Sequence, residues 1–206
     1  MTEVSTPETV LWLLRHPEPD ASILGRCYGW LDAPLSAVGV RQAQAIAGAL
    51  VHEPFAAIYT SPLERCAHTA QILAAGRSSA VESRAELREM NLGVCEGLTY
   101  DEIAQRFPDL YRHWMEHPSE AQFPEGESLT SMRSRVIPTV QELRQRHTGQ
   151  TIAVVTHAGV IRILLADALQ MPLSAVFRLG QSYGTINRIR YFGESPVVEL
   201  FNAPPR

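Results

Sequence analysis

Two histidines that lie far apart in the sequence, His16 and His157, each follow a short apolar segment. An imidazole can attack an electrophile, and it can accept or donate a proton near neutral pH. Arg15 directly precedes His16, and its guanidinium stays charged and matches the oxygens of a phosphate or carboxylate group. Two imidazoles and a guanidinium in these positions predict a site for an anionic substrate.

The segments before the two histidines are expected to be neighbouring buried strands. Residues 10–14 are five consecutive apolar residues, and Pro17, which has no N–H for a strand ladder, ends the strand just after His16. The second strand, residues 151–156, ends directly before His157, and a helix follows at once. If the strands are parallel neighbours, both imidazoles lie at the sheet edge where open α/β sheets bind ligands. They then face each other across one pocket.

A third strand, residues 56–60, leads into a segment that starts a helix. We expect Ser61 to be the N-cap of this helix and Pro62 to occupy its first position, where a missing N–H is harmless. Arg65 then lies about one turn into the helix and can reach back over its N-terminal end. On spacing alone, Arg65 is either a second ligand for the anion or an exposed helix arginine.

Three glutamates, Glu86, Glu89 and Glu96, lie within residues 86–97, a loop segment that follows a short edge strand. Each carries a carboxyl group that can act as a general acid or base. A loop glutamate is most often simply solvated, so the residues alone do not choose among the three.

Residues 95–125 are expected to form an irregular helical cap over the pocket, broken at Pro108 and Pro118. The cap carries five aromatic residues: Tyr100, Phe107, Tyr111, Trp114 and Phe123. These rings either stack on a planar part of the substrate or pack as core, and core packing is the favoured interpretation. His113 and His117 have the spacing of a metal pair on one helix face, but no glutamate follows His113, so we interpret both as solvated.

The composition predicts one globular domain, residues 1–206. The net charge of −4 argues against a nucleic-acid or anionic-membrane partner. No apolar run approaches the roughly 20 residues of a membrane span. Nothing in the sequence defines the oligomeric state, and a homodimer is allowed.

The cysteines and the N-terminus indicate the compartment. Cys27, Cys66 and Cys95 show no metal-ligand spacing, and an odd number cannot all pair internally. The first eight residues are polar and lack the apolar stretch of a secretory signal. Buried free thiols in a reducing compartment fit best, so we expect a cytoplasmic protein.

The signature residues resemble those of the histidine phosphatase family, the superfamily of cofactor-dependent phosphoglycerate mutases. That family carries Arg-His-Gly after its first strand, where this chain has Arg15-His16-Pro17. Its second signature is similar to residues 61–70, and its His-Gly-Gly is similar to His157-Ala158-Gly159. The resemblance covers nearly the whole chain. It implies an α/β fold of the phosphoglycerate mutase type, a three-layer α/β/α sandwich with a mostly parallel central sheet and one antiparallel edge strand.

The resemblance also implies roles for individual residues. By alignment, His16 is the nucleophile that forms a phosphohistidine, and Glu89 is the proton donor. Arg15, Arg65 and His157 complete the catalytic set around the phosphate. The implied substrate-binding positions are Arg15, Arg65, Ser22, which stands six residues after the nucleophile, and Ala158, at a helix N-terminus whose N–H groups can approach an anion. No metal and no cofactor are required, because guanidinium and imidazole groups neutralise the phosphate.

The implied function is hydrolysis of a phosphomonoester on a small phosphorylated metabolite. Arg-His-Pro, together with the stretch Gly25-Arg26-Cys27-Tyr28-Gly29, looks most like the α-ribazole phosphatase branch. One alternative is a phosphoglycerate mutase, but mutases tend to carry Glu-Arg-His-Tyr-Gly where this chain has Glu89-Met90-Asn91-Leu92-Gly93. The other alternative is a non-catalytic phosphate-binding module, which has no use for a proton donor. The Pro17 that replaces the family glycine is the main departure.

Overall fold

The computed structural model describes residues 7–205, whose strands and helices alternate along most of the chain. The strands are β1 (Glu8–Arg15), β2 (Phe55–Thr60), β3 (Ala80–Ser83), β4 (Thr151–Thr156), β5 (Ile186–Phe192) and β6 (Ser195–Ala203). The α-helices are α1 (Ala37–Ala49), α2 (Glu64–Ala74), α3 (Tyr100–Arg106), α4 (Pro108–Glu116), α5 (Leu129–Arg146) and α6 (Ala158–Ala168). Four short 3-10 helices are η1 (Ala21–Ile23), η2 (Ala85–Leu87), η3 (Gly93–Cys95) and η4 (Leu173–Arg178).

The six strands form one sheet in the order β3-β2-β4-β1-β5-β6. The first four in this order run parallel, and β1 lies directly beside β4. The chain ends in the hairpin of β5 and β6, which pairs antiparallel with β1 and closes one edge of the sheet. The prediction of a mostly parallel sheet with an antiparallel edge is therefore confirmed.

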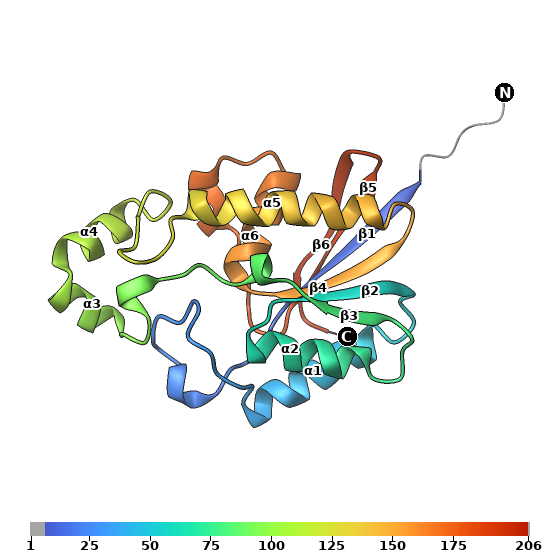
Figure 1. The fold of residues 1–206 in the computed structure, drawn as a ribbon, viewed down its shortest axis with the longest axis horizontal. Helices are drawn as coiled ribbons and strands as arrows, with labels where there is room; N and C mark the ends of the chain where they lie inside the picture. Colours follow the sequence, from blue (N-terminus) through green and yellow to red (C-terminus); the bar gives the residue numbers. More distant parts are fainter. Residues whose placement is uncertain (1–6, 206) are drawn as a thin grey trace.

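The sheet is covered on both faces, which gives three layers (Figure 1). Helices α5 and α6 lie on one face, and α1 and α2 lie on the other. Alternate residues of the central strands therefore enter different cores. Leu11 and Leu13 join the core on the α5–α6 side, while Trp12 and Leu14 join the core on the α1–α2 side. Burial on both faces explains why β1 is a continuous apolar run.

Helices α3 and α4 extend beyond the three layers, on the left in Figure 1. Local signals in the sequence set their boundaries. Thr99 and Glu102 form a capping box, in which each side chain accepts the other residue's backbone N–H. Pro108 begins α4, where its missing N–H has no intrahelical partner to lose. The predicted break at Pro108 is confirmed.

One local prediction is wrong. Helix α2 begins at Glu64, and its N-cap residue is Leu63 rather than Ser61. Ser61 Oγ accepts only a long 3.4 Å hydrogen bond from the Leu63 N–H. The serine hydroxyl instead forms a hydrogen bond with His157, which directly follows a different strand, β4.

The expectation for the polar N-terminus falls mainly on residues 1–6, which lie outside the described residues. Across residues 7–205, the helices are all too short or too polar to cross a lipid bilayer.

Candidate active site

His16 lies at the carboxyl end of β1, and its ring is held by the residue that follows it. His16 is only 2% exposed. Its Nδ1 lies 2.8 Å from the carbonyl oxygen of Pro17. Because a carbonyl oxygen can only accept a hydrogen bond, Nδ1 carries the ring proton and Nε2 keeps its lone pair. The tautomer that this contact selects is the one in which Nε2 can act as a nucleophile.

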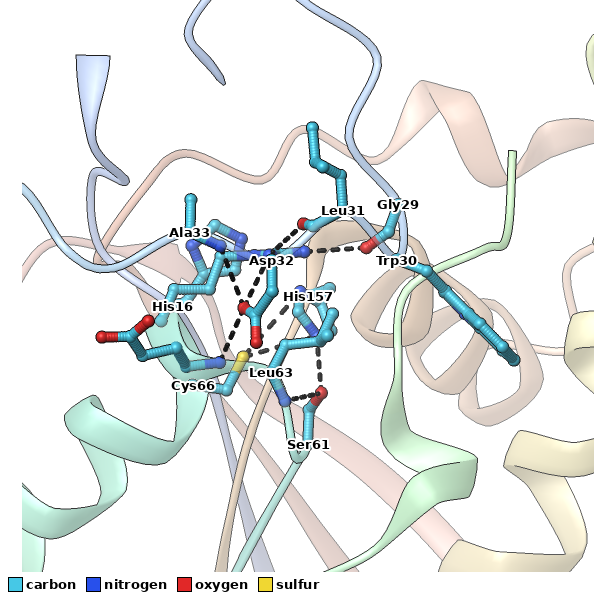
Figure 2. A network of polar contacts seen from close by, with 12 residues as sticks. His16, Gly29, Trp30, Leu31, Asp32, Ala33, Ser61, Leu63, Cys66 and His157 are labelled. Atoms are coloured by element: carbon cyan, nitrogen blue, oxygen red, sulfur yellow. Dashed lines mark hydrogen bonds and ion pairs between the residues drawn. The ribbon is translucent and has the colours of Figure 1, made fainter. Parts of the chain in front are cut away.

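His157 faces His16, as the two strand ends predicted. In the parallel ladder, Arg15 of β1 lies opposite Thr156 of β4, so the next residues of both strands are neighbours. The two imidazole centroids are 5.1 Å apart, with an angle of 62° between the rings. Both histidines are drawn in Figure 2.

A buried hydroxyl and a buried thiol orient His157 from below (Figure 2). Its Nε2 lies 2.8 Å from Ser61 Oγ and 3.4 Å from Cys66 Sγ. Burial raises the pKa of the Cys66 thiol, so this group stays protonated. Ser61 and Cys66 therefore fix the position of the imidazole and add no charge to it.

Both histidines are neutral at physiological pH. Burial lowers the pKa of His16 well below its ordinary value, and the nearby charges of Arg65 and Arg15 lower it further. Burial and the charge of Arg65 lower the pKa of His157 in the same direction. A cation next to an imidazole disfavours the imidazolium form, so the lone pair of His16 remains available.

Arg65 is the largest of the fully buried side chains, and loop carbonyls hold it in place. Nη1 donates to the carbonyl oxygen of Leu31 at 3.0 Å, and Nη2 donates to that of Gly29 at 2.8 Å. These bonds end at the labelled Gly29 and Leu31 in Figure 2. Asp32 Oδ1 lies 3.8 Å from Nη1. The structure therefore places Arg65 inside the molecule, and the interpretation as an exposed helix arginine is wrong.

Arg15 is the second guanidinium beside the histidines. Its Nη1 donates to the carbonyl oxygen of Gln181, and its guanidinium carbon lies 4.1 Å from the ring centroid of Tyr183. Four buried side-chain atoms within residues 7–205 lack a hydrogen-bond partner, and two of them are the Nε atoms of Arg15 and Arg65. Unpaired buried donors beside two neutral imidazoles suit an incoming anion.

Glu96 binds backbone N–H groups of a loop, and this structural role argues against Glu96 as the proton donor. Its carboxylate accepts backbone N–H groups from Gly29, Trp30, Leu31 and Leu92 at 2.8 to 3.0 Å. These bonds shape the loop whose carbonyl oxygens hold Arg65. Glu96 therefore holds the backbone around Arg65 in place.

Glu89 is the one glutamate of the three that lines the pocket with His16. Its Oε1 accepts the N–H of Met90 at 2.8 Å, and its Oε2 accepts the N–H of Gly159 at 3.0 Å. Gly159 lies in the first turn of α6, where we expected N–H groups to approach an anion. In this structure the N–H of Gly159 donates to the carboxyl group of Glu89.

Arg135 and Glu127 hold the backbone around Glu89. The Arg135 guanidinium donates to both carboxylate oxygens of Glu127 and to three carbonyl oxygens of the loop, those of Glu86, Arg88 and Glu89. Glu127 also accepts the N–H of Asn91 at 2.9 Å. This clamp ties the loop to α5, and through the loop it fixes where the Glu89 side chain begins.

The pocket continues from the histidines toward helices α3 and α4, with a volume of about 230 Å³. Tyr100 of α3 and Trp114 of α4 line it and stack on each other, with ring centroids 5.3 Å apart. Trp114 also packs on buried Phe123, which agrees with the preference for core packing, but Tyr100 is 48% exposed. Phe177 of η4 completes this apolar wall.

Two of the predicted substrate-binding residues lie outside this lining. Ser22 is exposed on η1, and its N–H donates to Asp20. Ala158 is buried at the start of α6, and its neighbour Gly159 lines the pocket instead. Within residues 7–205 no three His, Cys, Asp or Glu side chains gather in an arrangement suited to a metal ion.

Arg162, which also lines the pocket, was not predicted from the sequence. It is the single charged residue in an apolar part of α6, residues 158–166. A charge inside such a run was the signal that could have identified it, because a buried helix rarely carries an unpaired charge.

Comparisons with known proteins identify a family and relatives of this chain. A model of the histidine phosphatase superfamily (branch 1) matches residues 11–204. Phosphoserine phosphatase 1 of Hydrogenobacter thermophilus is 34% identical over 180 residues, 86% of this chain and 85% of that protein. The adenosylcobalamin/alpha-ribazole phosphatase of Escherichia coli is 34% identical over 173 residues, 83% of this chain and 85% of that protein. Among solved structures, Bacillus stearothermophilus YhfR is similar with a TM-score of 0.89 and 32% identity, covering 94% of this chain and 96% of its own.

Proposed function

Because this chain belongs to the histidine phosphatase superfamily, we propose that it hydrolyses a phosphomonoester through a covalent phosphate on His16. The family and its phosphatase-named relatives make the chain a phosphatase. The proposal concerns the mechanism and the residues that carry it. The observation that supports it most directly is the contact between His16 Nδ1 and the Pro17 carbonyl oxygen, which leaves Nε2 free to attack.

In the first step, His16 Nε2 attacks phosphorus and the bond from phosphorus to the alcohol oxygen breaks. Arg15 and Arg65 neutralise the phosphoryl oxygens, and His157 adds a hydrogen bond to one of them. Glu89, in its protonated form, gives its proton to the departing alcohol oxygen. The products are a phosphohistidine, the free alcohol and an ionised Glu89.

In the second step, water attacks the phosphohistidine from the side that the alcohol has left. The Glu89 carboxylate takes a proton from this water, and the bond from phosphorus to Nε2 breaks. Inorganic phosphate leaves, and neutral His16 and protonated Glu89 are restored. The lowered pKa of His16 supports this step, because it makes the ring a better leaving group than an ordinary imidazole.

Cysteine is the alternative nucleophile in the pocket, and its protonation argues against it. Cys27 lines the pocket, but burial raises its pKa to about 12. A thiol that stays protonated is a weak nucleophile. All three cysteines are buried and unpaired, which supports a reducing compartment such as the cytoplasm.

Trapping the intermediate tests this proposal. Enzyme quenched in acid-free conditions after mixing with ³²P-labelled substrate is expected to carry acid-labile, base-stable label on His16. His16→Ala is expected to keep its fold, checked by circular dichroism, and to carry no label. Activity that survives EDTA is expected as well. Label on a serine, aspartate or cysteine, or a requirement for added Mg²⁺ or Zn²⁺, would contradict the mechanism.

Two substrates are supported by the relatives. α-Ribazole 5′-phosphate is the one that the sequence resemblance favours, and the Escherichia coli relative is named for it. O-Phosphoserine is supported by the Hydrogenobacter thermophilus relative, which is equally similar. Both are small phosphorylated metabolites. A cationic side chain in the pocket can distinguish them, because O-phosphoserine carries a carboxylate. α-Ribazole 5′-phosphate carries no anionic group beyond its phosphate.

A further inference from the structure

Arg162 adds a third guanidinium to a pocket in which Arg15 and Arg65 already flank the histidines. It lies on α6, three residues after Gly159, whose N–H holds Glu89. Its Nε donates to the carbonyl oxygen of Leu179 at 2.8 Å, and this bond fixes the orientation of the guanidinium plane. Within residues 7–205 neither Nη nitrogen has a hydrogen-bond partner, and neither is closed off from solvent. Four N–H bonds of Arg162 are therefore free to meet a ligand.

The acidic side chains around the pocket make their hydrogen bonds with groups other than the Arg162 guanidinium. Among the described residues 7–205, Glu89 is the only carboxylate that lines the pocket, and both of its oxygens accept backbone N–H groups. Arg26, a further cation in the lining, lies 3.5 Å from Glu102 and donates to the carbonyl oxygen of Gly97. A phosphate dianion is matched by the two guanidinium groups beside the histidines. Among the arginines that line the pocket, Arg162 is the one whose two Nη nitrogens both lack a hydrogen-bond partner within residues 7–205.

The guanidinium of Arg162 is partly desolvated in this place. Arg162 is half-buried beside the apolar wall, with its guanidinium carbon 5.8 Å from the ring centroid of Phe177. Burial lowers the pKa of Arg162, the nearby Glu89 partly offsets this effect, and the charge of Arg15 lowers the pKa further. A partly desolvated charge is stabilised when a ligand supplies the opposite charge.

We propose that Arg162 binds a carboxylate on the alcohol part of the substrate, so that the preferred substrates are phosphate esters of hydroxy acids. Two parallel N–H donors on one guanidinium match the two oxygens of a carboxylate. O-Phosphoserine and 3-phosphoglycerate belong to this class, and α-ribazole 5′-phosphate does not. This inference rests on the proposed function, because it assumes that the phosphate is placed at His16.

Two matched pairs of substrates isolate the carboxylate. O-Phosphoserine and O-phosphoethanolamine differ only in the carboxylate. 3-Phosphoglycerate and glycerol 3-phosphate differ in carboxylate against hydroxymethyl, and neither has an ammonium group. The measurement is kcat/KM by phosphate release for all four compounds and for α-ribazole 5′-phosphate. The wild-type protein is expected to prefer the carboxylate member of both pairs by about 10- to 100-fold, the range of a charge-assisted hydrogen-bond pair.

Arg162→Gln and Arg162→Lys test the residue, and the readout is the ratio of kcat/KM within each pair. In Arg162→Gln this ratio is expected to fall to near one. In Arg162→Lys the ratio is expected to lie between the value of the wild-type protein and that of Arg162→Gln. Arg178→Gln is the matched control, because Arg178 is an exposed arginine on neighbouring η4 outside the pocket lining. Its ratio is expected to equal that of the wild-type protein.

Each result decides between named outcomes. An equal loss for both members of a pair in Arg162→Gln would overturn the inference, since Arg162 would then act on the phosphate or on Glu89. A wild-type preference for α-ribazole 5′-phosphate over both carboxylates would also overturn it. The proposed function fails separately, and only if no substrate, including p-nitrophenyl phosphate, is hydrolysed through a labelled His16.

Discussion

Glu89 Oε2 accepts the backbone N–H of Gly159 at 3.0 Å, and a Cβ on residue 159 would lie 2.2 Å from Glu89 Oε1. The residue proposed as proton donor and the helix that follows His157 are therefore in direct contact across 70 residues of sequence. This contact requires glycine, since any side chain at position 159 occupies the space of the carboxylate.

Gly159→Ala is expected to displace the Glu89 carboxylate and to slow proton transfer. A misplacement of about 1 Å can reduce turnover by up to about 100-fold, so kcat with an alkyl phosphate is expected to fall by roughly that factor. Gly48→Ala is the matched control, because nothing lies within 4 Å of a Cβ at this exposed position of α1. Steady-state kinetics with an alkyl phosphate compares the two variants. Equal kcat values for Gly159→Ala and the control would contradict the predicted displacement.

Glu89→Gln is expected to separate substrates by their leaving group. An alkyl alcohol needs a proton as its bond to phosphorus breaks, whereas p-nitrophenolate leaves without one. The rate of phosphohistidine formation is expected to fall by about 10²- to 10⁴-fold for an alkyl ester and by much less for p-nitrophenyl phosphate. Because Glu89 also activates water in the second step, the rate must be measured in a single turnover. Equal losses for both esters would show that Glu89 is not the acid.

The central strands and the facing histidines could be predicted from the sequence because the signals are local. A five-residue apolar run, a proline after it and a histidine between them mark where β1 ends. In β4, an apolar run that ends just before His157, with a helix directly after it, placed the second histidine. Once both strands are parallel neighbours, the pairing of Arg15 with Thr156 makes His16 and His157 neighbours at the sheet edge.

The parts that could not be predicted depend on contacts between distant residues. Ser61 has the sequence context of an N-cap, but its hydroxyl is within 2.8 Å of His157 Nε2, which lies 96 positions away. Glu89 and Glu96 look alike in a loop, and only their backbone partners on other segments separate them. The local sequence defines which roles a residue such as Ser61 or Glu89 can take. Hydrogen bonds with distant segments determine which of these roles it has in the folded protein.

The buried neutral histidines are expected to make the protein less stable in mild acid. The folded-state pKa of His16 and of His157 is lowered below the ordinary value of 6.5, so between these values the unfolded chain binds more protons than the folded one. Stability is therefore full above pH 6.5 and is lost as the pH falls toward the folded-state pKa. From pH 7 to 5.5 each histidine is expected to cost about 1 kcal/mol.

Urea unfolding at the two pH values measures this loss. In His16→Gln the difference in unfolding free energy between pH 7 and 5.5 is expected to shrink by about 1 kcal/mol, because one of the two groups is gone. His113→Gln is the matched control, since His113 is exposed on α4. A His16→Gln profile that follows the wild-type profile would mean that His16 already carries a proton in the folded protein.

The clamp of Arg135 and Glu127 predicts a positioning effect that can be told apart from a loss of stability. Arg135→Lys keeps the charge, but an ammonium group cannot span Glu127 and three loop carbonyl oxygens at once. Acceptors left without partners are expected to lower the free energy of unfolding by about 1–3 kcal/mol. The loosened loop is also expected to move Glu89 and to slow the alkyl ester by about tenfold or more.

The leaving group shows whether Arg135 acts through Glu89. If it does, Arg135→Lys slows phosphohistidine formation from an alkyl ester more than from p-nitrophenyl phosphate. When Arg135→Lys is added to Glu89→Gln, it is then expected to cause no further difference between the two esters. Arg133→Lys is the matched control on the same helix, because Arg133 pairs with Asp167 at 2.9 Å on the exposed face. Such an exposed pair contributes about 0–1 kcal/mol, and its replacement is expected to leave both esters unaffected. A merely structural clamp would slow both esters by one common factor, because fewer molecules would be folded while each folded molecule kept its proton donor in place.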